Sequence, residues 1–345
     1  MGSGGRRDDY EISRLVLESN PDFAQRTRYC PDRKTNVGRM YYCDEETNCW
    51  SQECDPLMEL KIRKCVNRMP QSTLTSKETF YVQSYRGIKK ILYAVGRILI
   101  DTRFDERLDS NGVANFALEN LRVTVDGAHA AILPGDFIQT TAGWRYDVDL
   151  AALHRGDVAR YFEQVFPVPE ERKAVLAFFA GCLSGCSLTS KKNVLVLSDR
   201  RQGYSGKNVL MRLMEGFFGD YCTSRMDFAC RMDFACKATR IVMSYELNNL
   251  KELIAGKRRL GVGDRFKSVW QTNMILVFKE EDCPKYDISG DVFNRLVFAP
   301  MRSKFVFEMP LQPVDHTFLW DIHISYRFPL WRSALLDLLL DHVGV

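Results

Sequence analysis

The sequence predicts an α/β protein, and three observations indicate this class. Residues 193–198 (NVLVLS) form a continuous apolar run of strand length, which is typical of a strand buried on both faces of a parallel sheet. A glycine-containing loop follows, and residues 208–219 (NVLMRLMEGFFG) have the pattern of a helix closed by Gly219. Two further strands of the buried type, RIVMSYE (240–246) and TNMILVF (272–278), complete the alternation of strand, helix and strand.

The other segments are mixed α+β before this region and helical after it. Residues up to about 70 are polar and cysteine-rich with one short basic helix (KIRKCVNRM), and residues 79–100 have the apolar spacing of one or two helices. Short runs rich in β-formers, broken by Asn-Gly, Asp-Gly and Pro-Gly, predict strands and hairpins over 104–147. Two amphipathic helices (DVARYFEQVF and PEERKAVLAFFAGCLSG) precede the apolar strand, and a strongly apolar helix (328–343) ends the chain. We therefore expect four regions: 1–103, cysteine-rich and helical; 104–150, small and β-rich; 151–325, the α/β domain; and 326–345, a C-terminal helix.

Composition restricts the class of protein further. The 345 residues are 46% hydrophobic and 27% charged, as in ordinary globular proteins, and no apolar run approaches the roughly 20 residues of a membrane span. The N-terminus has no apolar core of the signal-peptide kind, so we expect an intracellular protein that is neither secreted nor bound to a membrane. A net charge of only +4 means that any nucleic-acid contact must come from local patches.

The 11 cysteines, an odd number without a secretion signal, favour reduced thiols over a disulfide framework. Five of them fall early, at irregular spacing, without a C-x-x-C pair and without a nearby histidine: Cys30, Cys43, Cys49, Cys54 and Cys65. Buried free thiols are the favoured interpretation, and a structural zinc is the alternative.

The loop after the first apolar strand is close to the phosphate-binding pattern G-x-x-x-x-G-K-[ST]. Its Gly206-Lys207 pair matches, whereas Arg201 occupies the first glycine position and Asn208 the Ser/Thr position. Because the loop joins a buried strand to a helix, its backbone N–H groups and Lys207 suit the phosphates of ATP, and the Asn208 amide could be a weak Mg²⁺ ligand. We predict that the nucleotide-binding residues are Gly203, Tyr204, Ser205, Gly206, Lys207 and Asn208.

Three further side chains are predicted to be catalytic. Glu246 ends a hydrophobic strand, where it could orient and deprotonate the attacking water; the alternative is a solvent-facing glutamate. Asn273 opens another buried strand and could bond the γ-phosphate or the water, or be only a turn residue. Arg295 precedes an apolar strand and could act across a subunit boundary, or form a surface salt bridge.

The segment 251–270 combines six basic residues with two acids, three glycines and the aromatic residues Phe266 and Trp270. Basic charge interleaved with aromatic rings favours contact with single-stranded nucleic acid, and a solvated charged face is the alternative. The predicted DNA-binding residues are Lys257, Arg258, Arg259, Arg265 and Lys267.

Taken in order, these parts resemble the superfamily 3 helicases, specifically the poxvirus-type primase-helicase of large DNA viruses, over roughly residues 80–340. That family's loop reads G-x-G-x-N-G-K-[ST]; Gly203, Gly206 and Lys207 match it, and Ser205 replaces the asparagine. Residues 111–147 look like the family's pre-helicase domain. Glu246 falls on its Walker B glutamate, Asn273 on its sensor asparagine and Arg295 on the second position of its arginine pair.

The resemblance implies an AAA+-like P-loop NTPase domain that forms a hexameric ring, with ATP and Mg²⁺ bound between subunits. It also implies translocation on single-stranded or forked DNA at a viral replication site in the host cytoplasm or nucleus, with a primase or polymerase as a further partner. The first function expected is thus an ATP-driven DNA helicase. The alternative is a degenerate homologue that acts as a DNA-binding or replisome scaffold module, because Arg201, Asn208 and the missing acid before Glu246 all weaken the phosphate and metal site.

Overall fold

The computed structural model divides the chain into two compact units, which are described separately. The first unit comprises Met1–Ser110 and Ile132–Gln139, and the second comprises Asn111–Ala131 and Thr140–Val345. The structure describes residues 7–31, 38–109, 115–124, 126–184, 194–199, 204–225, 238–244, 273–279, 296–312 and 314–343. The division differs from the four predicted regions, because the expected small domain 104–150 contributes residues to both units.

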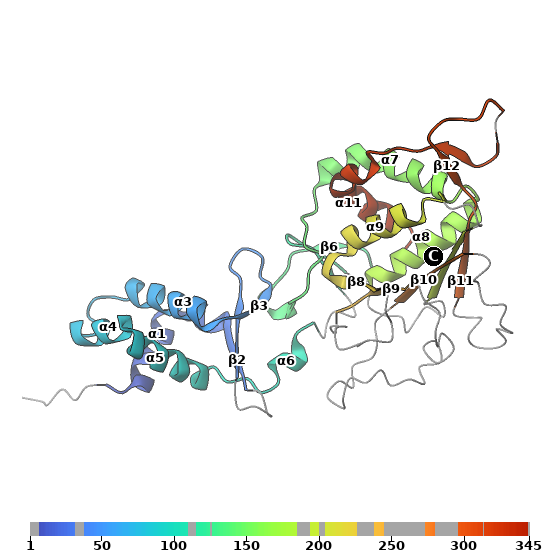
Figure 1. Ribbon diagram of the computed structural model, residues 1–345. Coiled ribbons are helices and arrows are strands. Elements are labelled where there is room, and N and C mark those ends of the chain that lie inside the picture. Colours follow the sequence, from blue (N-terminus) through green and yellow to red (C-terminus); the bar gives the residue numbers. More distant parts are fainter. Residues whose placement is uncertain are drawn as a thin grey trace, which may run out of the picture. The chain divides into compact units, whose positions relative to one another are not determined.

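The first unit combines a helical cluster with a three-stranded antiparallel sheet (Figure 1). Its helices are α1 (Asp9–Ser19), α2 (Pro21–Gln25), α3 (Asp55–Arg68), α4 (Ser76–Gln83), α5 (Tyr85–Ile98) and α6 (Phe104–Arg107). The sheet has the order β1 (Thr27–Cys30), β2 (Arg39–Cys43), β3 (Trp50–Glu53). The apolar pattern over 79–100 thus forms two helices, and the predicted short basic helix is the second half of α3. Helices α3 and α5 bury apolar side chains, such as Ile62 of α3 and Ile91 of α5, in one core.

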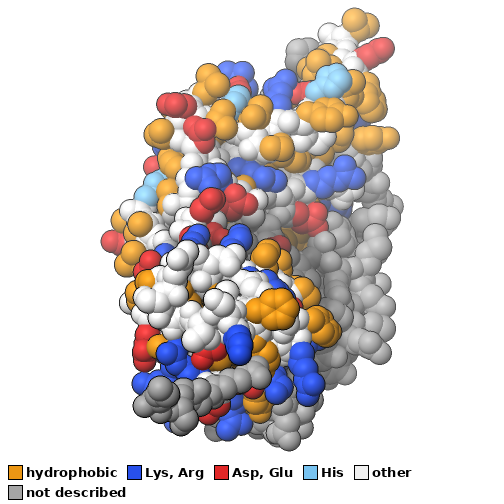
Figure 2. Space-filling view, turned by 90° about the vertical axis from the view of Figure 1, so that its left-hand side faces the viewer, with side chains coloured by type: hydrophobic (Ala, Val, Ile, Leu, Met, Phe, Trp, Pro, Cys, Tyr) orange, Lys and Arg blue, Asp and Glu red, His pale blue; other side chains and the backbone are white. Residues whose placement is uncertain are grey.

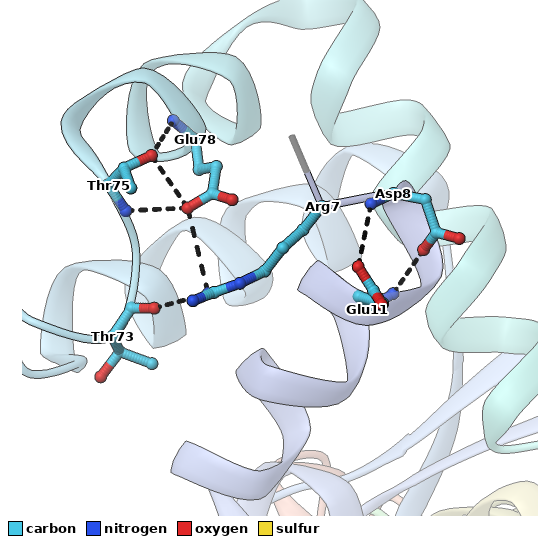
Figure 3. A network of polar contacts seen from close by, with 6 residues as sticks. All are labelled: Arg7, Asp8, Glu11, Thr73, Thr75 and Glu78. Carbon is cyan, nitrogen blue, oxygen red and sulfur yellow. Dashed lines mark hydrogen bonds and ion pairs between the residues drawn. The ribbon is translucent and has the colours of Figure 1, made fainter. Parts of the chain in front are cut away.

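Side-chain caps fix the starts of α1 and α4 in the first unit (Figure 3). Asp8 accepts a hydrogen bond from the backbone N–H of Glu11 at 2.7 Å, and Glu11 accepts one from the backbone N–H of Asp8 at 3.3 Å. The same reciprocal box joins Thr75 and Glu78, in which Glu78 accepts the Thr75 N–H at 2.8 Å and the Thr75 hydroxyl at 2.9 Å. These bonds lower the pKa of Glu78, and Arg7 at 4.0 Å favours its charged form further.

The centre of the second unit is a parallel five-stranded sheet of order β11-β7-β10-β9-β8. Its strands are β7 (Val194–Asp199), β8 (Cys222–Arg225), β9 (Ile241–Ser244), β10 (Asn273–Lys279) and β11 (Leu296–Met301). Strand β7 is buried along nearly its whole length, as its apolar sequence predicts. The α/β class with a parallel sheet is therefore confirmed.

Helices α7 (Val148–Val165), α8 (Pro169–Leu183), α9 (Lys207–Phe218) and α11 (Ile324–Leu340) form the helical layers of the second unit (Figure 1). Helix α8 packs against β11 and α9 against β8, while α11 crosses both helices and runs beside α7. Helix α9 ends at Gly219, whose φ of +51° and distance of only 2.1 Å from an added Cβ to the Ala142 carbonyl oxygen require glycine. Helices α8 and α9 agree with the sequence prediction, whereas α7 begins nine residues before the predicted segment 157–166.

A small antiparallel sheet of β4 (Phe116–Ala117), β5 (Arg122–Val123) and β6 (His129–Ala130) also belongs to the second unit. Phe116 stacks on Phe217 of α9 at 5.8 Å, and the Trp144 indole donates a hydrogen bond to the Phe217 carbonyl at 2.7 Å. This β-rich segment therefore shares the core of the α/β sheet. Two short strands, β12 (Lys304–Val306) and β13 (Thr317–Leu319), pair in parallel after β11.

Each cysteine within the described ranges has a free thiol, and no group of three or more potential metal ligands occurs among those residues. Burial raises the pKa of the Cys43 and Cys65 thiols to about 11. In the same part of the chain, no helix has the length and apolar character needed to cross a membrane.

Candidate nucleotide-binding site

The predicted phosphate loop begins at the carboxyl edge of the parallel sheet. Asp199 ends β7 there, level with Lys279 of β10 and Met301 of β11. From β7 the chain passes to the far edge strand β8, and from β10 it crosses β7 to reach β11. The connection that follows β7 and the connection that follows β10 thus run in opposite directions along the sheet. In open α/β sheets, ligands bind outside the carboxyl ends of the strands at such a point.

Backbone conformation at the end of the loop depends on Gly206. This residue is the N-cap of α9 with φ +82°, and its carbonyl accepts the first helical hydrogen bond from the Leu210 N–H at 2.9 Å. A Cβ at this position would lie 2.8 Å from the Phe305 ring. Tyr204 also has a positive φ, of 58°, and its carbonyl accepts a hydrogen bond from the Phe305 N–H at 2.8 Å. Contact with β12 therefore holds Tyr204 and Gly206 at positive φ, and at position 206 only glycine fits without strain.

The N-terminus of α9 is suited to an anion. Its N-cap Gly206 provides no side chain to bond the first-turn N–H groups, and the first turn contains no acidic residue. The first N–H groups of a helix and the positive end of its dipole together attract phosphate, and α9 is 12 residues long.

Asp199 is the side chain that the sequence analysis did not identify. Its carboxylate accepts a hydrogen bond from the Ser205 hydroxyl at 3.1 Å and forms an ion pair with the Lys207 amine at 3.0 Å. The Asp199 and Lys207 side chains are only 8% and 15% exposed, so water screens this ion pair poorly. An acid at the end of an otherwise apolar strand next to the loop was the available signal in the sequence.

The residues present can accommodate a nucleotide and a magnesium ion. Asn208 lies exposed in the first turn of α9, and Tyr204 is exposed beside the Phe307 ring at 6.4 Å between centroids. The Asn208 amide offers an oxygen ligand of the kind that Mg²⁺ accepts, while the Asp199 carboxylate is paired with Lys207. Lys207 supplies positive charge next to the α9 N–H groups, which fits a triphosphate.

The structure places Asn273 away from the loop, in disagreement with its predicted sensor role. Asn273 is the first residue of β10 and is buried at the amino edge of the sheet, whereas Lys279 at the other end of β10 is level with Asp199. Six residues of strand separate the two edges by about 20 Å. A side chain cannot bridge this distance, so Asn273 is not part of the candidate site.

Arg302 is a cation near the carboxyl edge that the sequence analysis did not select. It follows β11 directly and donates hydrogen bonds from Nε and Nη2 to the Glu171 carboxylate of α8 at 3.1 and 2.8 Å.

The other predicted site residues lie outside the described residues: Gly203, Glu246, Arg295, Lys257, Arg258, Arg259, Arg265 and Lys267. Their roles remain predictions.

The sheet order and the loop between β7 and α9 are consistent with a P-loop NTPase-like fold. No family model matches the chain, and no curated protein matches it significantly. Among solved structures, it is similar to the A form apo structure of the NrS-1 C-terminal region, with a TM-score of 0.48 at 10% identity over 98% of this chain and 70% of that one. A second apo structure of the NrS-1 C-terminal region gives 0.46 at 11% identity over 99% and 70%. The X-ray structure of JCV helicase gives 0.35 at 10% identity over 97% and 86%. Similarities this distant carry no argument about function.

Proposed function

We propose that the chain is an ATP-dependent DNA helicase with an AAA+-like nucleotide site of the superfamily 3 type. One observation carries the proposal: a glycine with positive φ and Lys207 begin α9 directly beyond the carboxyl edge of the buried strand β7. This is the arrangement in which backbone N–H groups and a cation bind phosphates.

In this proposal the N–H groups of α9 hold the phosphates, and Lys207 exchanges Asp199 for a phosphate oxygen. Mg²⁺ held by Asn208 would neutralise charge on the phosphates when bound. Glu246, predicted to orient and deprotonate the attacking water, and Arg295, predicted to act from a neighbouring subunit, complete the proposed catalytic set. The basic residues of segment 251–270 are the proposed contact with single-stranded DNA.

Assembly into a ring, proposed as a homo-hexamer, is supported by exposed apolar side chains after β12. Eight lie within residues 307–330: Phe307, Met309, Leu311, Val314, Leu319, Ile322, Tyr326 and Leu330. The top of Figure 2, where the β12–β13 segment lies, shows such hydrophobic side chains on the surface. Clusters of this kind mark protein contacts, and a second copy is the occupant that would complete a nucleotide site beside Phe307.

The test is steady-state ATPase of the purified chain with and without single-stranded DNA, beside Lys207→Ala. We expect DNA-stimulated turnover that the substitution abolishes, and unwinding of a forked duplex by the same preparation. Turnover equal in both proteins would refute the proposed site.

A degenerate homologue that acts as a DNA-binding or replisome scaffold module is the second candidate. This candidate rests on two features: Asp199 forms an ion pair with Lys207, and Asn208 has no hydroxyl for a metal. If the site has decayed, Asn208→Ser should raise ATPase strongly; if asparagine is functional, the substitution should change it little. Slow hydrolysis by both proteins, with nucleotide and DNA still bound, would favour the scaffold module.

A further inference from the structure

One face of α5 in the first unit carries six exposed side chains, here called the α5 face: Tyr85, Arg86, Lys89, Lys90, Tyr93 and Arg97. At 3.6 residues per turn they fall within an arc of about 140°. Four are cations, and none is acidic. The opposite side of the helix is buried in the core of the first unit through residues such as Ile88 and Val95.

Helix stability explains Arg97, a cation in the last turn of α5, but not the three cations of its first two turns. The first turn of α5 contains no acidic residue, and Arg86 lies there, next to the positive end of the helix dipole. Lys89 and Lys90 follow Arg86 at i+3 and i+4, spacings at which like charges repel on a helix. The helix thus carries three cations that repel one another in its first two turns, with Arg86 at a position where an acidic residue would stabilise it, and this favours an anionic ligand.

Neighbouring carboxylates compensate this charge only in part. Lys90 is 3.7 Å from the Asp9 carboxylate of α1, and both side chains are partly exposed. Lys89 lies near Glu59 and Asp55 of α3. Exposed pairs of this kind are weak in water, so they can give way to phosphate.

Two tyrosines accompany the cations. Tyr85 is 71% exposed and Tyr93 is 65% exposed. The Lys89 amine lies 4.7 Å from the centre of the Tyr85 ring, and Arg97 donates a long hydrogen bond of 3.5 Å to the Tyr93 hydroxyl. Phe80 of α4, which is 77% exposed, adds a third ring in this part of the chain.

We propose that the α5 face binds single-stranded nucleic acid, with phosphates on the cations and unpaired bases stacked on Tyr85 and Tyr93. Arg86 and Arg97 are eleven residues apart, or about 16 Å along the helix, which matches about five phosphates of a stacked strand. Duplex DNA would satisfy the cations but offers no free base faces to the tyrosines. The inference does not depend on nucleotide hydrolysis and adds a contact in the first unit to the one proposed for segment 251–270.

The test measures binding of a labelled oligodeoxythymidylate to the full chain by fluorescence anisotropy at several salt concentrations. Tyr85→Ala and Tyr93→Ala should each weaken binding by about 5-fold or more, because stacking of one base on an aromatic ring is lost. Lys89→Gln with Lys90→Gln should reduce the slope of log affinity against log salt by about 1.4, since each phosphate contact on a single strand contributes about 0.7.

The matched controls are Lys64→Gln with Arg68→Gln on the exposed side of α3, and Tyr10→Ala, which removes a 49% exposed ring from α1. Both controls should retain affinity and salt slope, and thermal unfolding checks that every variant is folded. Lys207→Ala should leave this binding unchanged while abolishing nucleotide hydrolysis, so failure of the proposed hydrolysis can be told apart from failure of the α5 face.

Three results would overturn the inference. One is an equal loss of affinity in the control and the α5 variants, which would indicate general charge attraction. Another is unchanged affinity in all the α5 variants. The third is a loss confined to duplex DNA or to anionic phospholipid vesicles, which would assign the face to a different partner.

Discussion

Asp199→Asn should increase nucleotide affinity, because Asp199 and a phosphate compete for the same amine. The Asp199 carboxylate and the Lys207 amine are 3.0 Å apart in a nearly buried position. Coulomb's law at an effective dielectric constant of about 20 gives an attraction of about 5 kcal/mol at this distance. Competition with hydration reduces the net contribution to about 1.5–3 kcal/mol. The substitution should therefore tighten nucleotide binding by about 10- to 150-fold.

The same change should destabilise the nucleotide-free protein. Lys207 would keep its charge without a carboxylate, and breaking a buried ion pair in this way costs about 3 kcal/mol. Saturating nucleotide should then restore stability, because a ligand at about 100 times its Kd adds about 2.7 kcal/mol to the free energy of unfolding. Asparagine retains an oxygen that can accept the Ser205 hydroxyl hydrogen bond, so the loop should keep its conformation.

Calorimetric titration of nucleotide and thermal unfolding with and without nucleotide measure both effects. Asp220→Asn is the matched control, since it removes an exposed carboxylate after α9. The gain in affinity should vanish in a Lys207→Ala background, where no amine remains for the two anions to share. Affinity that is unchanged or weaker in Asp199→Asn would refute the competition and assign Asp199 to the nucleotide-bound state instead.

Three further predictions concern the rest of the chain. Gly206→Ala should abolish nucleotide binding and lower the free energy of unfolding by at least about 1–2 kcal/mol, because φ is +82° and the added Cβ would lie 2.8 Å from an aromatic ring. The control Gly216→Ala inside α9 should instead stabilise the protein by about 0.5–1 kcal/mol. Equal effects of the two substitutions in thermal unfolding would contradict this reasoning. Glu78→Gln should lower the free energy of unfolding, measured in urea, by about 0.5–1 kcal/mol at neutral pH. Because folding lowers the pKa of Glu78 from 4.5, the difference between the two proteins should shrink as pH falls through the folded pKa. A difference that grows in acid would contradict the lowered pKa. Alkylation at about pH 8, followed by mass spectrometry, should modify exposed Cys54 before Cys65, because burial raises the pKa of the Cys65 thiol to about 11. Alkylation of Cys65 should become faster as pH rises. Equal rates for the two thiols would disprove the burial of Cys65.

Local patterns in the sequence were sufficient for the α/β class and for the position of the candidate loop. The apolar run that forms β7 and the helical periodicity of α9 depend on neighbouring residues, so each can be recognised within a short window. The junction between them contains Gly206 and Lys207, and their place at a helix start follows from the same windows. The two helices α4 and α5 were predictable for the same reason.

Tertiary structure decided which side chains meet. Register across the sheet places Asn273 at the amino edge and Asp199 at the carboxyl edge, and register depends on pairing between segments about 80 residues apart in the sequence. Likewise, Phe116 belongs to the second unit because it packs against α9, about 100 residues later in the chain. The sequence by itself therefore determined β7, α9 and the position of the loop between them, because these depend on local periodicity. Only the packed structure decided that Asp199 pairs with Lys207 and that Asn273 lies on the other edge, because these contacts depend on how distant strands align.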